Sequence, residues 1–126
     1  MIASDEFRVR VLKGFGIDFE RLHLCDNLDS FSLATIEQGI LYFYLRPNPL
    51  SHRMLRHIAE CLAPLQPIDF YVLDREVFWK WIHEHLRCPE HSAGSLFWVR
   101  AGQVFHQENV LTKCDSIQRI SRECFG

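Results

Sequence analysis

The residues best suited to chemistry gather in the segment 46–54, RPNPLSHRM. This segment follows an apolar run and opens a stretch of helical periodicity, so free backbone N–H groups and a helix dipole would meet there. Arg46, His52 and Arg53 add two guanidinium groups and an imidazole at the same place. These groups are typical of a site for an anion or a carboxylate. The alternative interpretation is a solvated helix end with surface arginines.

A second cluster, His83, His85, Cys88 and His91, contains side-chain types that bind zinc. His83 and His85 are two residues apart, so on a helix they point about 200° apart and cannot share a metal ion. His85 also falls on an apolar stripe, so we expect it to be a hydrogen-bonded histidine of the core. We therefore expect no bound metal or other cofactor, with zinc at Cys88 and His91 as the alternative.

The chain has five cysteines, an odd number, and none of them forms a C-x-x-C pair. The pattern predicts free, small, buried side chains and no disulfide framework. Thiol–disulfide exchange needs a thiolate, usually at a helix N-terminus, with a resolving partner nearby. The sequence places no cysteine at a helix N-terminus with a resolving cysteine nearby. The five cysteines are Cys25, Cys61, Cys88, Cys114 and Cys124.

Length and composition predict one globular domain spanning residues 1–126, with 48% hydrophobic and 24% charged residues. A net charge of −2 gives no field to attract nucleic acid or an anionic membrane. No apolar run approaches the ~18 residues of a membrane span. The opening MIASDEFRVR lacks the apolar core of a signal peptide, which favours a cytoplasmic protein.

The element that must position segment 46–54 is the apolar run Ile40–Leu45 before it. Because this run is continuous and does not alternate, it predicts a central strand covered on both faces. Pro47 and Pro49 end the strand, and apolar residues at helical spacing predict a helix over 50–62.

The remaining patterns predict a chain order of β-α-β-α-β-α-β-β-α, preceded by a short helix over 5–14. Asp74 would cap the helix that begins near Glu76, and Asp115 would cap the last helix, with Gln118 in capping-box spacing. The other predicted elements are a strand over 20–24, a helix through 31–36 ending near Gly39, a strand over 68–73, a hairpin of 95–99 with 103–106, and a last helix whose inner stripe is Ile117, Ile120 and Cys124.

This order resembles the thioredoxin fold, an α/β architecture. LHLCDNLDSF followed by GILYFYL resembles the opening strand, helix and central strand of that family, and IDFYVLDRE resembles its third strand. SLFWVRAGQVFHQ resembles the family's hairpin with Gly102 at the turn, and CDSIQRISREC resembles its last helix. The resemblance covers residues 20–124. It implies a central mixed sheet of about four or five strands flanked by helices, with an extra helix at the N-terminus.

The functional positions of the family are the ones that differ. Its C-G-P-C motif falls on segment 46–54, where Pro49 and His52 stand in place of the two cysteines. Its buried acid falls at Phe43, and its cis-proline falls near Gly94. The resemblance therefore implies a protein without conventional thioredoxin activity and favours a protein that is not an enzyme.

The function that this resemblance implies is a redox-inactive thioredoxin-like protein that binds a polypeptide as an adaptor or assembly chaperone. Thioredoxin-like proteins without C-x-x-C, including hydrogenase-maturation chaperones of this size, behave in this way, and an immunity-type or regulatory binder fits the same features. Trp79 lies off the apolar stripe of its helix and is either an exposed second contact or packed beneath loop 87–94. The expected binding residues are Arg46, Asn48, Ser51, His52, Arg53, Trp79 and Gly94.

A second hypothesis is an enzyme that uses a single thiol, or a glutathione- or anion-binding site at the N-terminus of the 50–62 helix. His52 and Arg53 would hold the anion, and one cysteine would need a strongly lowered pKa. The edge strands over 20–24 and 103–106 would also permit a homodimer.

Overall fold

The computed structural model describes residues 22–44, 49–62, 65, 68–86, 95–109 and 113–125. The predicted helix over 5–14 lies outside the described residues, and so do Cys88 and His91, the alternative zinc site. None of the described helices is both long and apolar enough to span a membrane.

Five strands form one mixed sheet, as the resemblance implies, and their order across the sheet is β1-β3-β2-β4-β5. β1 and β2 run parallel to β3, whereas β4 is antiparallel to β2 and β5 is antiparallel to β4. The strands are β1 (Leu22–Cys25), β2 (Gln38–Tyr44), β3 (Asp69–Asp74), β4 (Ser95–Arg100) and β5 (Gln103–Asn109). The helices are α2 (Pro49–Leu62), α3 (Arg75–His85) and α4 (Cys114–Phe125), with 3-10 turns η1 (Leu28–Ser30) and η2 (Leu33–Thr35).

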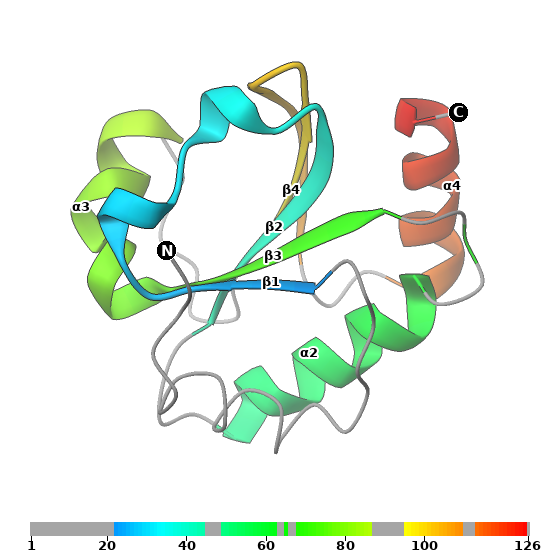
Figure 1. The fold of residues 1–126 in the computed structure, drawn as a ribbon. Helices are drawn as coiled ribbons and strands as arrows, with labels where there is room; N and C mark the ends of the chain where they lie inside the picture. Colours follow the sequence, from blue (N-terminus) through cyan, green and yellow to red (C-terminus); the bar gives the residue numbers. More distant parts are fainter. Residues whose placement is uncertain are drawn as a thin grey trace.

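Strand β2 lies at the centre of the sheet and is covered on both faces (Figure 1). Ile40, Tyr42 and Tyr44 point into a core shared with α2 and α4, while Leu41 and Phe43 point into a second core shared with α3. All five side chains are at most 7% exposed. The prediction of a central strand covered on both faces is therefore confirmed. The apolar run is continuous because neither face of the strand meets water.

The predicted helix through residues 31–36 is wrong, because the chain forms the two 3-10 turns η1 and η2 there. The Asn27 side chain accepts the N–H of Asp29 at 2.9 Å, which starts η1 as a local side-chain turn. Phe31 is extended, with φ −120° and ψ 134°, and it packs against the α3 core together with Leu33. Side chain–backbone bonding of this kind competes with helix formation.

The predicted capping box of the last helix is also wrong. Helix α4 begins at Cys114, one residue before Asp115. The Gln118 side-chain amide donates a hydrogen bond to the carbonyl oxygen of Cys61 at 2.9 Å, so it joins α4 to the end of α2. The Gln118 side chain therefore makes a tertiary contact and does not form the cap of its own helix that the local pattern predicts. The cap of α3 is confirmed, since the Asp74 carboxylate accepts the N–H of Glu76 at 3.0 Å.

The β4–β5 hairpin turns through Ala101 and Gly102, which both have positive φ values of 52° and 76°. Two consecutive residues of this kind are what a tight hairpin with the right-handed twist of a sheet requires. The Ala101 N–H donates to the carbonyl of Glu37 at 2.8 Å, and the Gly102 N–H donates to the carbonyl of Ile36 at the same distance. The turn is therefore held against the segment that leads into β2.

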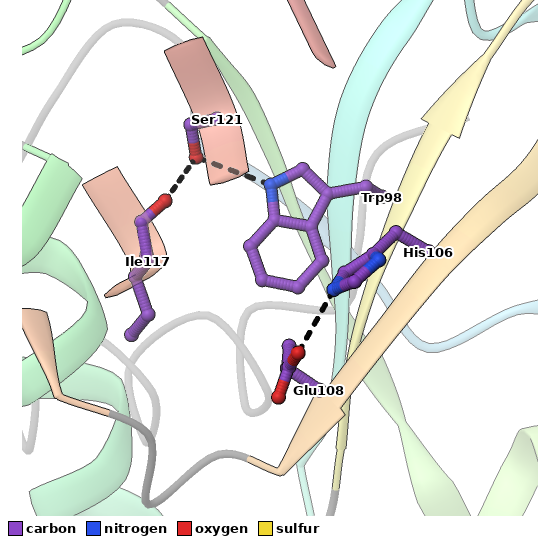
Figure 2. A network of polar contacts seen from close by, with 5 residues as sticks. All are labelled: Trp98, His106, Glu108, Ile117 and Ser121. Atoms are coloured by element: carbon purple, nitrogen blue, oxygen red, sulfur yellow. Dashed lines mark hydrogen bonds and ion pairs between the residues drawn. The ribbon is translucent and has the colours of Figure 1, made fainter. Parts of the chain in front are cut away.

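A buried polar chain joins β4 to α4 (Figure 2). The indole N–H of Trp98 donates to the Ser121 hydroxyl at 3.1 Å, and that hydroxyl donates to the carbonyl of Ile117 at 2.8 Å. The His106 ring lies edge-on to Trp98 at 5.4 Å between centroids, and its Nε2 pairs with Glu108 at 2.9 Å. Trp98 and Ser121 are each at most 1% exposed, so water cannot replace their hydrogen bond.

We expect Ser121→Ala to lower the free energy of unfolding by about 1–3 kcal/mol, because the Trp98 indole N–H would stay buried without its acceptor. Urea unfolding followed by circular dichroism measures this loss. The control is a double-mutant cycle with Trp98→Phe, which removes the donor. The loss caused by Ser121→Ala should be smaller in the Trp98→Phe background, and equal losses in the two backgrounds would contradict the assignment.

Candidate functional site

The start of α2 is where the sequence places its binding site. α2 begins at Pro49, and Arg53 is exposed on it. β2 and β3 are paired in register up to Tyr44 and Asp74, so α2 and α3 both begin at the same edge of the sheet. Several predicted site residues lie outside the described part of the chain, namely Arg46, Asn48 and Gly94 entirely, and Ser51 and His52 by their side chains.

The position that the resemblance assigns to a buried acid is filled by the aromatic ring of Phe43. Phe43 is 7% exposed and packs against Phe97 at 5.7 Å and against Trp81 at 6.4 Å between ring centroids. An apolar ring can neither accept nor deliver a proton, so this position supplies no acid–base chemistry to the start of α2.

Trp79 is 46% exposed on α3, in agreement with the interpretation of an exposed contact. Its ring meets His83 edge to face at 4.4 Å, whereas His85 stacks on Trp81 at 4.7 Å. The two histidines therefore have different partners, as helix geometry predicts. The expectation that His85 lies in the core is wrong, because its side chain is exposed. His85 is nonetheless hydrogen-bonded, with Nδ1 3.0 Å from the carbonyl oxygen of Trp81.

The expectation that all cysteines are free is wrong for two of them. Cys61, in the last turn of α2, and Cys114, the first residue of α4, form a disulfide with 5.0 Å between their Cα atoms. Cys25 and Cys124 are not part of this disulfide, and Cys25 is buried. Burial raises the pKa of the Cys124 thiol, and the charge of Glu123 raises it further while Arg100 lowers it.

His57 completes a compact group with the disulfide. Its Nε2 lies 3.8 Å from Cys61 Sγ, because residues four apart on a helix share a face. The ring nitrogen and the two sulfur atoms all lie within 4.8 Å of one another. Cys61 is fully buried, whereas His57 and Cys114 are half-buried, so the group reaches the surface through these two residues. Zinc binds cysteine as the thiolate, so the closed disulfide leaves only the imidazole as a donor here.

Sequence reasoning missed the set His57, Cys61 and Cys114. One part of it is visible in the sequence, since His57 and Cys61 have the i, i+4 spacing of neighbours on a helix. The disulfide itself joins residues 53 positions apart, and only the packing of α2 against α4 brings them together. Cysteine spacing alone does not determine connectivity.

Among known proteins, no family model and no curated protein matches the chain. Solved structures do resemble it. Reduced desulfothioredoxin from Desulfovibrio vulgaris Hildenborough has a TM-score of 0.63 and 14% identity, covering 79% of this chain and 96% of its own. Mitochondrial thioredoxin 3 from Saccharomyces cerevisiae has a TM-score of 0.61 and 13% identity, covering 79% and 92%. The reduced thioredoxin pre-protein from Schistosoma mansoni has a TM-score of 0.64 and 9% identity, covering 84% and 100%. Identities this low show a shared fold and nothing more.

We expect reduction of the Cys61–Cys114 disulfide to lower the free energy of unfolding by about 2–4 kcal/mol, because the bond restricts a long loop of the unfolded chain. Urea unfolding with and without dithiothreitol measures the change. A Cys61→Ser/Cys114→Ser variant is the control, and its unfolding midpoint should not respond to dithiothreitol. Equal midpoints for the oxidised and reduced wild type would show that the bond does not stabilise the fold.

Proposed function

We propose that this chain, which has the thioredoxin fold, binds a polypeptide partner as an adaptor or assembly chaperone and performs no thiol chemistry at the start of α2. One observation carries the proposal. The sheet edge at which α2 and α3 begin is retained, while segment 46–54, which opens α2, contains no cysteine and Phe43 fills the place of an acid. A retained surface without its reactive groups favours recognition over catalysis.

The chemistry at this edge supports a partner segment that carries carboxylates. The N-terminus of α2 has no acidic residue in its first turn and presents the positive end of a helix dipole, whereas the N-terminus of α3 is already capped by the Asp74 carboxylate. Arg53 is exposed on α2, and Arg75 is the first residue of α3. Guanidinium groups bind carboxylates through paired hydrogen bonds, so an acidic side chain or a C-terminal carboxylate of the partner fits this edge.

Trp79 lies one helical turn beyond the start of α3 and supports the proposal as a second contact. Exposed tryptophan is enriched among the residues that contribute most to protein–protein binding. A polypeptide that met both Arg53 and Trp79 would combine an ionic contact with an apolar one. The absence of nucleic-acid and membrane partners belongs to the same proposal and is supported by the net charge of −2. A cytoplasmic location is also part of the proposal.

The single-thiol enzyme receives less support from the described cysteines. Cys25 is buried, and the raised pKa of Cys124 keeps its thiol protonated at neutral pH. A protonated thiol is a poor nucleophile. Glutathione or another anion, bound by His52 and Arg53, is the alternative ligand for the N-terminus of α2.

We expect Arg53→Glu to weaken capture of the partner about tenfold or more, because charge reversal replaces attraction of a carboxylate by repulsion. The matched control is Arg119→Glu, which makes the same charge change at an exposed position of α4. Both variants and the wild type are used as bait in native cell extract, and captured proteins are quantified by mass spectrometry and then titrated as purified components. If Arg119→Glu weakened capture as much as Arg53→Glu, the binding site would not lie at this edge. If the wild type captured no protein, the proposed function would be contradicted.

A further inference from the structure

We infer that Cys61 and Cys114 are a reversible thiol–disulfide pair that exchanges with a dithiol, with Cys114 as the sulfur under attack and His57 as the proton donor to Cys61. This activity goes beyond the proposed binding function. It is located at the far end of α2 from the proposed binding edge and depends on different residues.

The two cysteines differ in burial. Cys61 is 0% exposed and lies in the core with Ile58 and Leu62. Cys114, the first residue of α4, packs against the same core but is only half-buried. A thiolate from outside can therefore approach Cys114 Sγ, while the α2–α4 core shields Cys61. This asymmetry divides the pair into an attacked sulfur and a leaving sulfur, which is the arrangement that directional exchange needs.

Cys114 also lies where a thiolate is stabilised. It is the first residue of a helix of 12 residues, so it lies at the positive end of the helix dipole. Two exposed charges of opposite sign flank it, Lys113 and Asp115, and their effects on the sulfur oppose each other. The helix end therefore accounts for the stabilisation of Cys114 as a nucleophile in the reduced protein.

Cys61 needs a proton donor when it leaves, because a thiolate in an apolar core is unfavourable. His57 Nε2, at 3.8 Å from Cys61 Sγ, is close enough to hydrogen-bond to this sulfur and to pass it a proton. His57 is itself half-buried, so it can exchange that proton with solvent. The histidine thus allows a buried sulfur to leave as a neutral thiol.

The reaction balances as a two-electron exchange. One thiolate of the dithiol attacks Cys114 Sγ, a mixed disulfide forms, and the Cys61–Cys114 bond breaks with its electron pair on Cys61 Sγ. The His57 imidazolium transfers its proton to that sulfur. The second thiolate of the dithiol then attacks its own sulfur in the mixed disulfide, which releases Cys114 as a thiolate. The protein pair is reduced and the dithiol is oxidised to a disulfide.

Noncovalent contacts keep the two sulfurs within reach after the bond opens. The Gln118 side chain still donates to the carbonyl of Cys61, and Ile58 of α2 and Ile117 of α4 belong to one buried cluster. α2 and α4 can therefore stay packed in the reduced state, which favours closure of the disulfide in the reverse direction. Gln118 is a positioning residue in this scheme.

The test uses the full chain with Cys25→Ala, Cys88→Ala and Cys124→Ala, so that only the pair can react. Dithiothreitol is the dithiol probe, and reduction under native conditions is followed by alkylation and mass spectrometry. We expect reduction faster than global unfolding, and closure again with oxidised glutathione. His57→Gln should slow reduction about tenfold, through the poorer leaving group at Cys61. The matched control His83→Gln, an exposed histidine on α3, should leave the rate unchanged.

Single-cysteine forms of the same background assign the attacked sulfur. With oxidised glutathione as the probe, the Cys61→Ala form should give a mixed disulfide at Cys114 at least about tenfold faster than the Cys114→Ala form gives one at Cys61, since exposure governs reactivity.

Gln118→Leu should slow closure of the reduced pair without slowing its opening. Reduction only at the rate of unfolding would overturn the inference even if a single-cysteine form failed to fold, and faster reaction at Cys61 would overturn the assignment of Cys114. Neither result bears on Arg53, so the binding proposal is tested separately.

Discussion

The burial of β2 on both faces is the constraint on which the rest of the structure depends. One face needs α2 and α4 to cover Ile40, Tyr42 and Tyr44, and the other needs α3 to cover Leu41 and Phe43. Because a sheet with two apolar faces has no stable solvated form, each helix is required where it lies. The directions of α2 and α3 follow, and so does the sheet edge at which both begin.

The same packing gives α2 two different ends. Its start opens at the sheet edge, and its last turn is joined to α4 by the Cys61–Cys114 disulfide and by the hydrogen bond from Gln118. A thioredoxin scaffold that lacks cysteines at the start of α2 thus has a cysteine pair at the end of it. Disulfides in reducing compartments are commonly transient and have redox-sensing or catalytic roles, so the proposed cytoplasmic location is consistent with an exchange role for this pair.

Periodicity predicts the parts of the fold that depend on local pattern. The strand over 40–45, the helix over 50–62 and the cap Asp74 are all confirmed within small differences of boundary. The helix predicted through 31–36 fails because the Asn27 side chain starts a local turn that the periodicity does not record. Gln118 fails as a capping residue because its amide bonds a carbonyl on another helix.

The sequence predicts the order of most strands and helices from local pattern, because hydrophobic period and turn residues act over a few neighbours, and it predicts the mixed sheet only through its resemblance to the thioredoxin fold. It also determined that segment 46–54 has no cysteine and that Phe43 stands where an acid would be. The pairing of Cys61 with Cys114, and the full burial of Cys61 beside a half-buried Cys114, follow from the tertiary structure. Pairing across 53 residues depends on how two helices pack on one face of a sheet, and cysteine spacing does not encode that contact.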